Sequence, residues 1–471
     1  RFAPTAVGEW SYATVCEKKS DAGLCGRTGA FRVAPPRDDN PIFARGGFLR
    51  VSENRRFLTY SDGTPFFWLG DTWWFCPSTR CPIEGSSTPL HASMFRELID
   101  LSRRQVFTVV QMAFLDGRNS LNVEAHPHTW TEPNLEYWRL GDEYINYANA
   151  AGIIPVVGIG FHKNLDNVSG DHLQRLWRYV IARYGAFAVT WLIVGEYNLD
   201  NDPSRVEKTL ALGRFIKQLD PYKRAMTVHP WVYAREKRQS WDEPWNDFIM
   251  TQCGHDALPP AEFYLDIYRR SSPKPLLEGE CLYEGINGKT ADQVRRAAYR
   301  AIQAGSFGYT YGAHGLWYPT QSGDDRTFSE YGRPIPWWEA AGRRGGSEMQ
   351  LLREIYESVP WWQLEPRPDA VELEQAVSEE ERALTKAKGT EIYVIYFPRA
   401  VEPLNNALLP NADPEASYIA TWMSPVKRMW VLPNEPLRAG DRGLRLPARP
   451  GPGDWVLILH KTPSTSRPQL H

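Results

Sequence analysis

The chain has 471 residues with a formal net charge of -2, and hydrophobic residues fill 42% of its positions. Its 54 basic and 56 acidic residues balance, so the net charge does not indicate a nucleic acid or an anionic membrane as a binding partner. No segment reaches the roughly eighteen consecutive apolar residues of a membrane-spanning helix. The length predicts two or three domains.

Residues 1–40 predict a short N-terminal β segment. Two strand-like stretches, "GEWSYATVC" and "GRTGAFRVA", flank a turn-rich loop, and the linker "PPRDDNP" follows them. So few strands bury too little apolar surface to form a core of their own. We therefore interpret the segment as a detached fragment of a β-module or as an edge docked on its neighbour.

Residues 46–360 predict a barrel. A hairpin with an Asp-Gly turn, "FLRVSENRRFLTYSDGTPF", opens this region. Eight apolar strands then alternate with helix-patterned stretches, which is the size and order of a (β/α)8 TIM barrel. The strands are "FFWLGDTWW", "VFTVVQMAF", "IIPVVGIGF", "VTWLIVGEYN", "RAMTVHP", "DFIMTQCGH", "KPLLEGECLYEG" and "SFGYTYGAHGLW".

Residues 365–465 predict a C-terminal β-sandwich. Short alternating strands such as "TEIYVIYF", "ASYIATWMSP" and "DWVLILHK" are separated by Pro, Asn and Gly, and no helical pattern interrupts them. The expected fold class is thus α/β: a TIM barrel with a C-terminal β-sandwich and a short N-terminal β segment.

The cysteine spacing predicts two short-range disulfides. Cys16 and Cys25 bracket one loop, and Cys76 and Cys81 bracket another. Neither pair has CxxC spacing and no histidines cluster beside them, so we expect no zinc site there. Disulfides form in oxidising compartments, so the protein is expected to be secreted or periplasmic.

Polar and aromatic residues stand at the ends of all eight predicted strands. In a TIM barrel the working residues lie at the carboxyl ends of the strands, so we expect these side chains to meet at one rim and bind substrate. Trp73, Trp231 and Trp317 should be partly exposed there, since aromatic faces that stack on sugars must be accessible. The candidate substrate-binding residues are Asp71, Trp73, Trp74, Gln111, His162, Asn198, His229, Trp231, Gln252, His255, Tyr283, Tyr311, His314 and Trp317.

Two glutamates suggest the reaction. The buried strand "WLIVGEYN" ends on Glu196, and Glu280 lies on the seventh strand, across the barrel mouth. Cleavage of a glycosidic bond needs one carboxylic acid to protonate the leaving oxygen and one carboxylate to attack the sugar or activate water. We assign Glu196 as acid/base and Glu280 as nucleophile. Glu278 has the same strand parity but lies deeper, so we interpret it as a hydrogen-bonded core residue.

Two other functions and one structural explanation remain open at this stage. A metal-dependent hydrolase could use His162, His229, His255 and His314 with Asp71, although no HxH pair stands at a strand end. A non-catalytic carbohydrate-binding protein would keep the aromatic rim without needing both carboxylates. A structural ion-pair network could also explain the paired glutamates.

Several of these stretches resemble the apiosidase-like glycoside hydrolases, a family of TIM-barrel enzymes acting on plant polysaccharides. They are "FLTYSDGTPFFWLGDTWW", "NLEYWRLGDEYINYANAAGIIPVV", "RYGAFAVTWLIVGEYN", "FIMTQCGH", "KPLLEGECLYEG" and "YTYGAHGLW". The C-terminal piece with "ATWMSP" resembles the β-sandwich of collagen-binding type that commonly follows this barrel. The resemblance implies a glycoside hydrolase that needs no cofactor and takes an oligo- or polysaccharide of plant or other complex origin as substrate.

The resemblance also assigns residues. It places the nucleophile at Glu280 and the strand-one aspartate at Asp71. Where the family usually has an aspartate after two glycines on strand four, this sequence has Glu196 after Gly195. A retaining mechanism requires the two carboxyl groups to lie about 5–5.5 Å apart, and we expect Glu196 and Glu280 to fall in that range. We also expect Glu196 to be the more readily protonated of the pair.

Overall fold

The computed structural model describes residues 1–462 with gaps. The residues outside the description are 37–39, 79, 86–87, 89, 115–133, 167, 232–238, 325–327, 334, 375–376, 400–406, 434 and 463–471. Among the described helices, none is long and apolar enough to cross a membrane.

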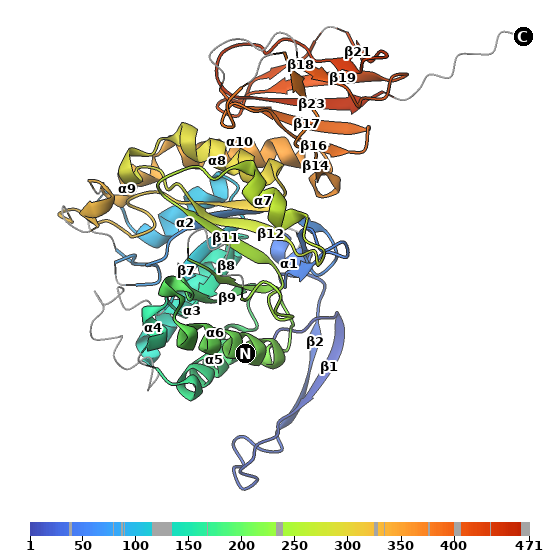
Figure 1. The fold of residues 1–471 in the computed structure, drawn as a ribbon. Helices are drawn as coiled ribbons and strands as arrows, with labels where there is room; N and C mark the ends of the chain where they lie inside the picture. Colours follow the sequence, from blue (N-terminus) through green and yellow to red (C-terminus); the bar gives the residue numbers. More distant parts are fainter. Residues whose placement is uncertain are drawn as a thin grey trace, which may run out of the picture.

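Eight parallel strands form the predicted barrel, which the structure confirms (Figure 1). They are neighbours in the order β10-β9-β8-β7-β6-β13-β12-β11, and every residue in them is buried. Helices cover the outer face, which is why these strands are apolar on both sides. The strands are β6 (Trp68–Thr72), β7 (Val109–Ala113), β8 (Ile154–Gly158), β9 (Thr190–Gly195), β10 (Met226–His229), β11 (Ile249–Gly254), β12 (Leu276–Cys281) and β13 (Gly308–Tyr311).

The barrel closes between β10 and β11 through hydrogen bonds from residues at the start of each strand. The backbone N–H of Asp247 donates to the Met226 carbonyl (3.0 Å), and the Asp247 carboxylate accepts from the Met226 N–H (2.9 Å). The hydroxyl of Thr227 donates to the Phe248 carbonyl (2.7 Å). The bottom of this seam is therefore held by side chains as well as backbone.

Amphipathic helices pack with an apolar face against the barrel. α5, for example, buries Leu173, Trp177 and Val180, three or four residues apart on one face. Ser169 begins this helix and accepts a hydrogen bond from the N–H of His172, as an N-cap residue does. The helices are α1 (Pro41–Ala44), α2 (Met94–Arg104), α3 (Leu135–Ala150), α4 (Lys163–Asp166), α5 (Gly170–Tyr184), α6 (Pro203–Leu219), α7 (Ala261–Tyr268), α8 (Ala291–Gln303), α9 (Trp337–Ala341) and α10 (Arg344–Glu357).

Short elements complete the N-terminal part and the loops. The hairpin β1 (Gly8–Ala13) and β2 (Thr28–Val33) is antiparallel and projects away from the barrel (Figure 1). A three-stranded sheet precedes the first barrel strand, with its Asp-Gly turn at Gly63 in the left-handed region (φ 89°). Its strands are β3 (Arg50–Val51), β4 (Leu58–Thr59) and β5 (Pro65–Phe66); the 3-10 turns are η2 (Leu199–Asn201), η3 (Ile286–Gly288), η4 (Ser329–Tyr331) and η5 (Trp361–Gln363).

Two antiparallel sheets form the C-terminal β-sandwich (Figure 1). Their facing residues, among them Ile395, Tyr418, Leu444 and Leu457, form a second hydrophobic core. The larger sheet contains β14 (Glu365–Pro366), β16 (Leu384–Lys388), β17 (Ile392–Phe397), β23 (Trp455–Lys461), β19 (Ser417–Met423), β20 (Trp430–Val431) and β21 (Leu437–Arg438). The smaller sheet contains β15 (Glu372–Leu373), β18 (Ala407–Leu409) and β22 (Leu444–Arg445).

The sandwich packs on α8 of the barrel. The ring of Tyr299 on α8 stacks on Tyr396 of β17, with centroids 4.5 Å apart. Arg295, which is almost completely buried, pairs with Asp454 of the sandwich (2.8 Å) and with Glu348 on α10 (2.5 Å). Removing one partner of this buried cluster would leave a charge uncompensated, which is strongly destabilising.

One of the two expected disulfides is present. Cys76 and Cys81 are bonded, with Cα atoms 5.8 Å apart. The prediction of a bond between Cys16 and Cys25 is wrong, since both are free thiols. Their loop turns at Asp21, whose carboxylate accepts from two following backbone N–H groups, and this turn aims the Cys25 thiol at the Cys16 carbonyl (3.8 Å) instead of its sulfur.

Candidate active site

A cavity of about 680 Å³ opens at the carboxyl ends of the barrel strands. Both candidate catalytic glutamates line it, one from the end of β9 and the other from β12. Nine of the residues predicted from sequence meet here: Trp74, His162, Glu196, Trp231, Gln252, His255, Glu280, Tyr283 and Trp317.

Glu280 is held by three side chains, His229, His255 and Trp74. His229 Nε2 lies 3.0 Å from Oε2, and His255 Nε2 lies 3.2 Å from Oε1. The indole N–H of Trp74 lies 3.1 Å both from Oε2 of Glu280 and from the hydroxyl of Tyr283. Trp74 in turn stacks on the His229 ring, with centroids 5.2 Å apart. The carboxylate is therefore fixed in one orientation.

The surroundings of Glu280 favour its ionised form. Burial by itself raises the pKa of a carboxyl group, but hydrogen bonds from His229 and His255, together with their positive charge, outweigh burial and hold the pKa of Glu280 well below its usual range. A carboxylate that is buried yet ionised can act as a nucleophile or as a base.

Glu196 lies in a looser environment. Gln252 donates to its Oε1 at 3.4 Å, and His162 Nδ1 lies 3.4 Å from its Oε2. Gln252 is also the residue that pairs with Glu280 in the β11–β12 register. The side chain of Gln252 therefore contacts Glu196, while its backbone lies beside that of Glu280.

The backbone turns sharply at Glu196. Its φ of 55° lies in the left-handed region, which costs a non-glycine residue about 1–3 kcal/mol, and its N–H donates to the His229 carbonyl (2.6 Å). Gly195 precedes it because a Cβ there would lie 2.5 Å from the ring of Phe161. The turn ends β9 and presents Glu196 to the cavity.

Glu278 lies below the cavity and does not line it. Its Oε2 accepts hydrogen bonds from Thr251, Cys253 and Tyr264 at 2.8–2.9 Å, and its Oε1 accepts from the N–H of Glu280 at 3.0 Å. Burial raises the pKa of Glu278 to about 7 despite these hydrogen bonds. The carboxyl group supports the backbone of Glu280 and is closed off from the cavity.

Four further candidates lie around the cavity without lining it. His229 contacts Glu280 from below. The Asn198 amide oxygen accepts from the N–H of Trp231 (2.7 Å), and Gln111 donates to the Gly279 carbonyl (3.0 Å). His314 Nε2 lies 3.2 Å from the Gly332 carbonyl. These four side chains do not line the cavity, where they were expected to contact substrate. They contact residues that line it, or the loops and strands around it.

Three candidates lie elsewhere. Asp71, Trp73 and Tyr311 border a separate small cavity together with residues of α2, α9 and α10. Side chains alternate along a strand, so Asp71 and Trp73 share the helix-facing side while Trp74 faces the mouth. Burial raises the pKa of Asp71 to about 7. The prediction that these three side chains lie at the substrate rim is wrong, because they point to the other side of their strands.

The expected exposure of the three rim tryptophans holds only in part. Trp231 is 36% exposed and lines the cavity. Trp317 lines it with 7% of its surface exposed, and Trp73 is fully buried outside it. Trp231 therefore offers an open aromatic face, whereas Trp317 presents an edge packed against Phe75 and Phe328.

Sequence reasoning missed three aromatic residues of the wall: Phe75, Phe161 and Tyr331. Phe161 stands directly before His162 and packs edge-on against Trp74 (5.4 Å between centroids), so its place at a strand end could have revealed it. Tyr331 comes from the 3-10 turn η4, beside His255 and Trp317. That segment has no periodic pattern, so only the folded chain shows the role of Tyr331.

The described residues include no group of three or more His, Cys, Asp or Glu side chains arranged to hold a metal ion. The four histidines considered as metal ligands do not meet at one point. His229 and His255 both contact Glu280, His162 lies beside Glu196, and His314 contacts a loop carbonyl. The alternative of a metal-dependent hydrolase therefore has no ligand set in this part of the chain.

Comparison with known proteins agrees with the fold. A solved structure described as a glycoside hydrolase superposes with a TM-score of 0.73 at 21% identity, covering 88% of this chain and 97% of its own. A glycoside hydrolase family 5 structure from Bacteroides vulgatus gives 0.74 at 22% identity, covering 88% and 94%. No curated protein sequence matches the chain. The family model "Apiosidase-like, catalytic domain" matches residues 52–363, so this chain belongs to the apiosidase-like family.

Proposed function

We propose that this protein is a retaining glycoside hydrolase with Glu280 as nucleophile and Glu196 as acid/base. One observation carries the proposal: two carboxyl groups from opposite strands line a single aromatic-walled cavity, and only one of them is clamped as an anion by two histidines and an indole. Such an asymmetric pair is what glycoside cleavage requires.

The roles follow from the contacts. In the first step Glu280 attacks the anomeric carbon while Glu196 gives its proton to the leaving oxygen, which forms a glycosyl-enzyme ester and releases an alcohol. In the second step Glu196 takes a proton from water, and the resulting hydroxide displaces Glu280 from the sugar. Hydrogen bonds from His229, His255 and Trp74 orient Glu280 for the attack.

The substrate class we propose is a glycoside of a plant or other complex polysaccharide. The exposed face of Trp231 and the aromatic wall suit the apolar face of a sugar ring, and the polar rim of His162, Gln252 and His255 suits its hydroxyls. Residues 46–360 would form the catalytic unit, flanked by the segment 1–40 and the sandwich 365–465. The Cys76–Cys81 disulfide supports a secreted or periplasmic location.

The test is a panel of aryl glycosides and cell-wall oligosaccharides, followed by NMR of the first product formed. We expect hydrolysis with retained anomeric configuration, and loss of at least about 10³-fold in kcat for Glu280→Gln, because the nucleophile is removed. Inverted product would refute retention but not hydrolysis. A Glu280→Gln variant with full activity would refute the assignment of the nucleophile.

A second test separates the acid/base from the nucleophile. Glu196→Ala should hydrolyse substrates with poor leaving groups far more slowly than substrates with acidic phenols, because only the former need a proton on the departing oxygen. Added azide should restore turnover by attacking the glycosyl-enzyme without base assistance. Equal loss on both substrate types would show that Glu196 has another role.

A further inference from the structure

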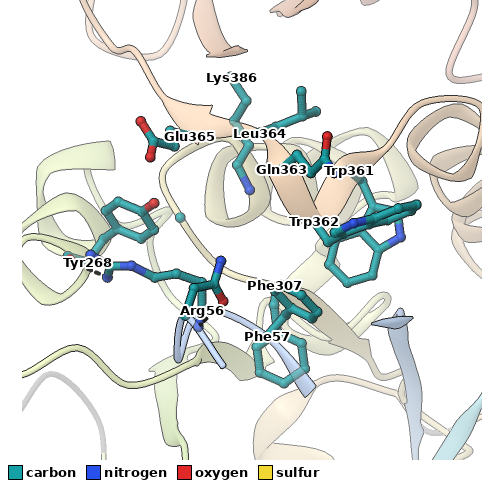
Figure 2. Close-up of a pocket in the computed structure, with 12 residues that line it drawn as sticks. Arg56, Phe57, Tyr268, Phe307, Trp361, Trp362, Gln363, Leu364, Glu365 and Lys386 are labelled. Atoms are coloured by element: carbon teal, nitrogen blue, oxygen red, sulfur yellow. Dashed lines mark hydrogen bonds between the residues drawn. The ribbon is translucent and has the colours of Figure 1, made fainter. Parts of the chain in front are cut away.

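Another cavity, of about 160 Å³, lies at the end of the barrel where its strands begin, away from the candidate active site. Figure 2 shows its lining residues. Its walls come from the loop before β13, the β3–β4 turn, the end of α7 and the connection into the sandwich. Five of the twelve lining residues are aromatic: Phe57, Tyr268, Phe307, Trp361 and Trp362. Gly305 allows this shape, since a Cβ there would lie 2.6 Å from the Tyr268 ring.

One buried cation reaches into this space. Lys386 on β16 is 6% exposed, and Figure 2 shows its amine directed into the cavity between Tyr268 and Trp362. Within the described part of the chain, its ammonium group has neither a hydrogen-bond partner nor an ion-pair partner, and burial alone lowers the pKa of Lys386 to about 8. Burying an unpaired charge is unfavourable unless a ligand or water compensates it.

The rest of the wall does not supply that compensation. Glu365 is exposed and pairs with Arg367 (2.8 Å). Arg56 adds a second cation, whose guanidinium lies 4.0 Å from the Tyr268 ring centroid and donates to the Tyr268 carbonyl (2.6 Å). The amide oxygen of Asn54 is occupied by Ser52, which leaves its N–H₂ group as a further donor at the cavity.

We propose that this cavity binds a six-membered ring that carries one carboxylate, held by Lys386 and sandwiched by the aromatic wall. Arg56 is already engaged by the ring and the carbonyl of Tyr268, so the ammonium of Lys386 is the cation left without a partner, and one carboxylate is enough to balance it. Flat aromatic faces favour a ring over a small ion such as acetate. Two sources share this chemistry, a sugar acid and an aromatic acid.

Isothermal titration calorimetry of the full chain with D-glucuronate and with benzoate tests the proposal. At least one should bind, at least tenfold more tightly than neutral glucose, acetate or phosphate; glucuronate alone would indicate a sugar acid, and benzoate alone an aromatic acid. Lys386→Met should weaken that binding at least tenfold. The matched control Lys388→Met should not, because Lys388 is partly exposed and pairs with Glu391.

Wild-type protein provides a second measurement if Lys386→Met fails to fold. Because the lysine must be protonated, affinity should be constant from pH 6 to 7 and fall as pH rises through about 8. Of the other groups around the cavity, Arg56 stays protonated, Glu365 is paired with Arg367, and burial raises the pKa of Tyr268 above its usual value. Phosphate binding more tightly than both acids, binding that Lys386→Met leaves unchanged, or affinity that is constant to pH 9.5 would each overturn the proposal.

Discussion

His229 lies with its Nε2 3.0 Å from Oε2 of Glu280, beneath the indole of Trp74. The histidine is fully buried at the end of β10, and the glutamate belongs to β12, so β11 lies between them in the barrel. This contact is one of two from histidines that keep a buried carboxyl group ionised.

His229→Gln should raise the pKa of Glu280, because the variant loses a positive neighbour while burial remains. The nucleophile must be ionised, so the acidic limb of kcat/KM should lie below the usual range of a glutamate in the wild type and move upward in the variant, with at least tenfold lower activity at pH 5. His172→Gln, on the exposed surface of α5, is the control and should leave the profile unchanged. Identical acidic limbs in wild type and His229→Gln would contradict the assigned role.

Glu278 should contribute to stability and not to chemistry. Its pKa of about 7 exceeds that of the unfolded chain, so its contribution is full below about pH 4.5 and is lost as pH rises through 7, by roughly 3 kcal/mol in all. Urea unfolding at pH 5 and pH 8 should show this decrease in wild type and a smaller one in Glu278→Gln. That variant should keep activity within tenfold; a loss as deep as that of Glu280→Gln would mean that Glu278 is the nucleophile.

The Cys76–Cys81 bond should stabilise the loop after β6. It closes a loop with a sequence separation of 5, for which chain entropy predicts about 2 kcal/mol. Cys76→Ser/Cys81→Ser should lower Tm, and dithiothreitol should lower Tm in wild type but not in this variant. Cys16→Ser/Cys25→Ser is the matched control and should melt like wild type, since those thiols are free. A lower Tm for this control than for wild type under oxidising conditions would restore the second disulfide.

Gly195→Ala should displace Glu196, because the new methyl would lie 2.5 Å from Phe161. We expect a loss of about 1–3 kcal/mol in stability and at least tenfold in kcat. Adding Phe161→Leu should recover part of the stability, since the smaller side chain leaves room for the methyl. A double variant no more stable than Gly195→Ala would place the strain in the backbone at residue 195 and not in the ring contact.

The sequence by itself determined the barrel. Eight apolar strands alternating with amphipathic helices allow few architectures, because strands buried on both faces need helices on both sides or a closed barrel. Once the strand order was known, the rule that carboxyl ends share one rim brought Glu196 and Glu280 into one cavity. The sandwich followed from its short alternating strands for the same reason.

The tertiary structure alone decided which rim residues face the cavity. Asp71 and Trp73 lie next to residues that face the cavity. Side chains alternate along a strand, so a shift of one residue turns a side chain from the cavity toward the helices. The free Cys16 and Cys25 thiols depend on a turn at Asp21, and Tyr331 reaches the wall from a loop without periodicity. In the sequence, Lys386 is one polar residue on a strand of alternating polarity. Only the packing of the sandwich on the barrel buries it without a partner among the described residues. Such properties arise from contacts between segments far apart in sequence, which no local pattern encodes.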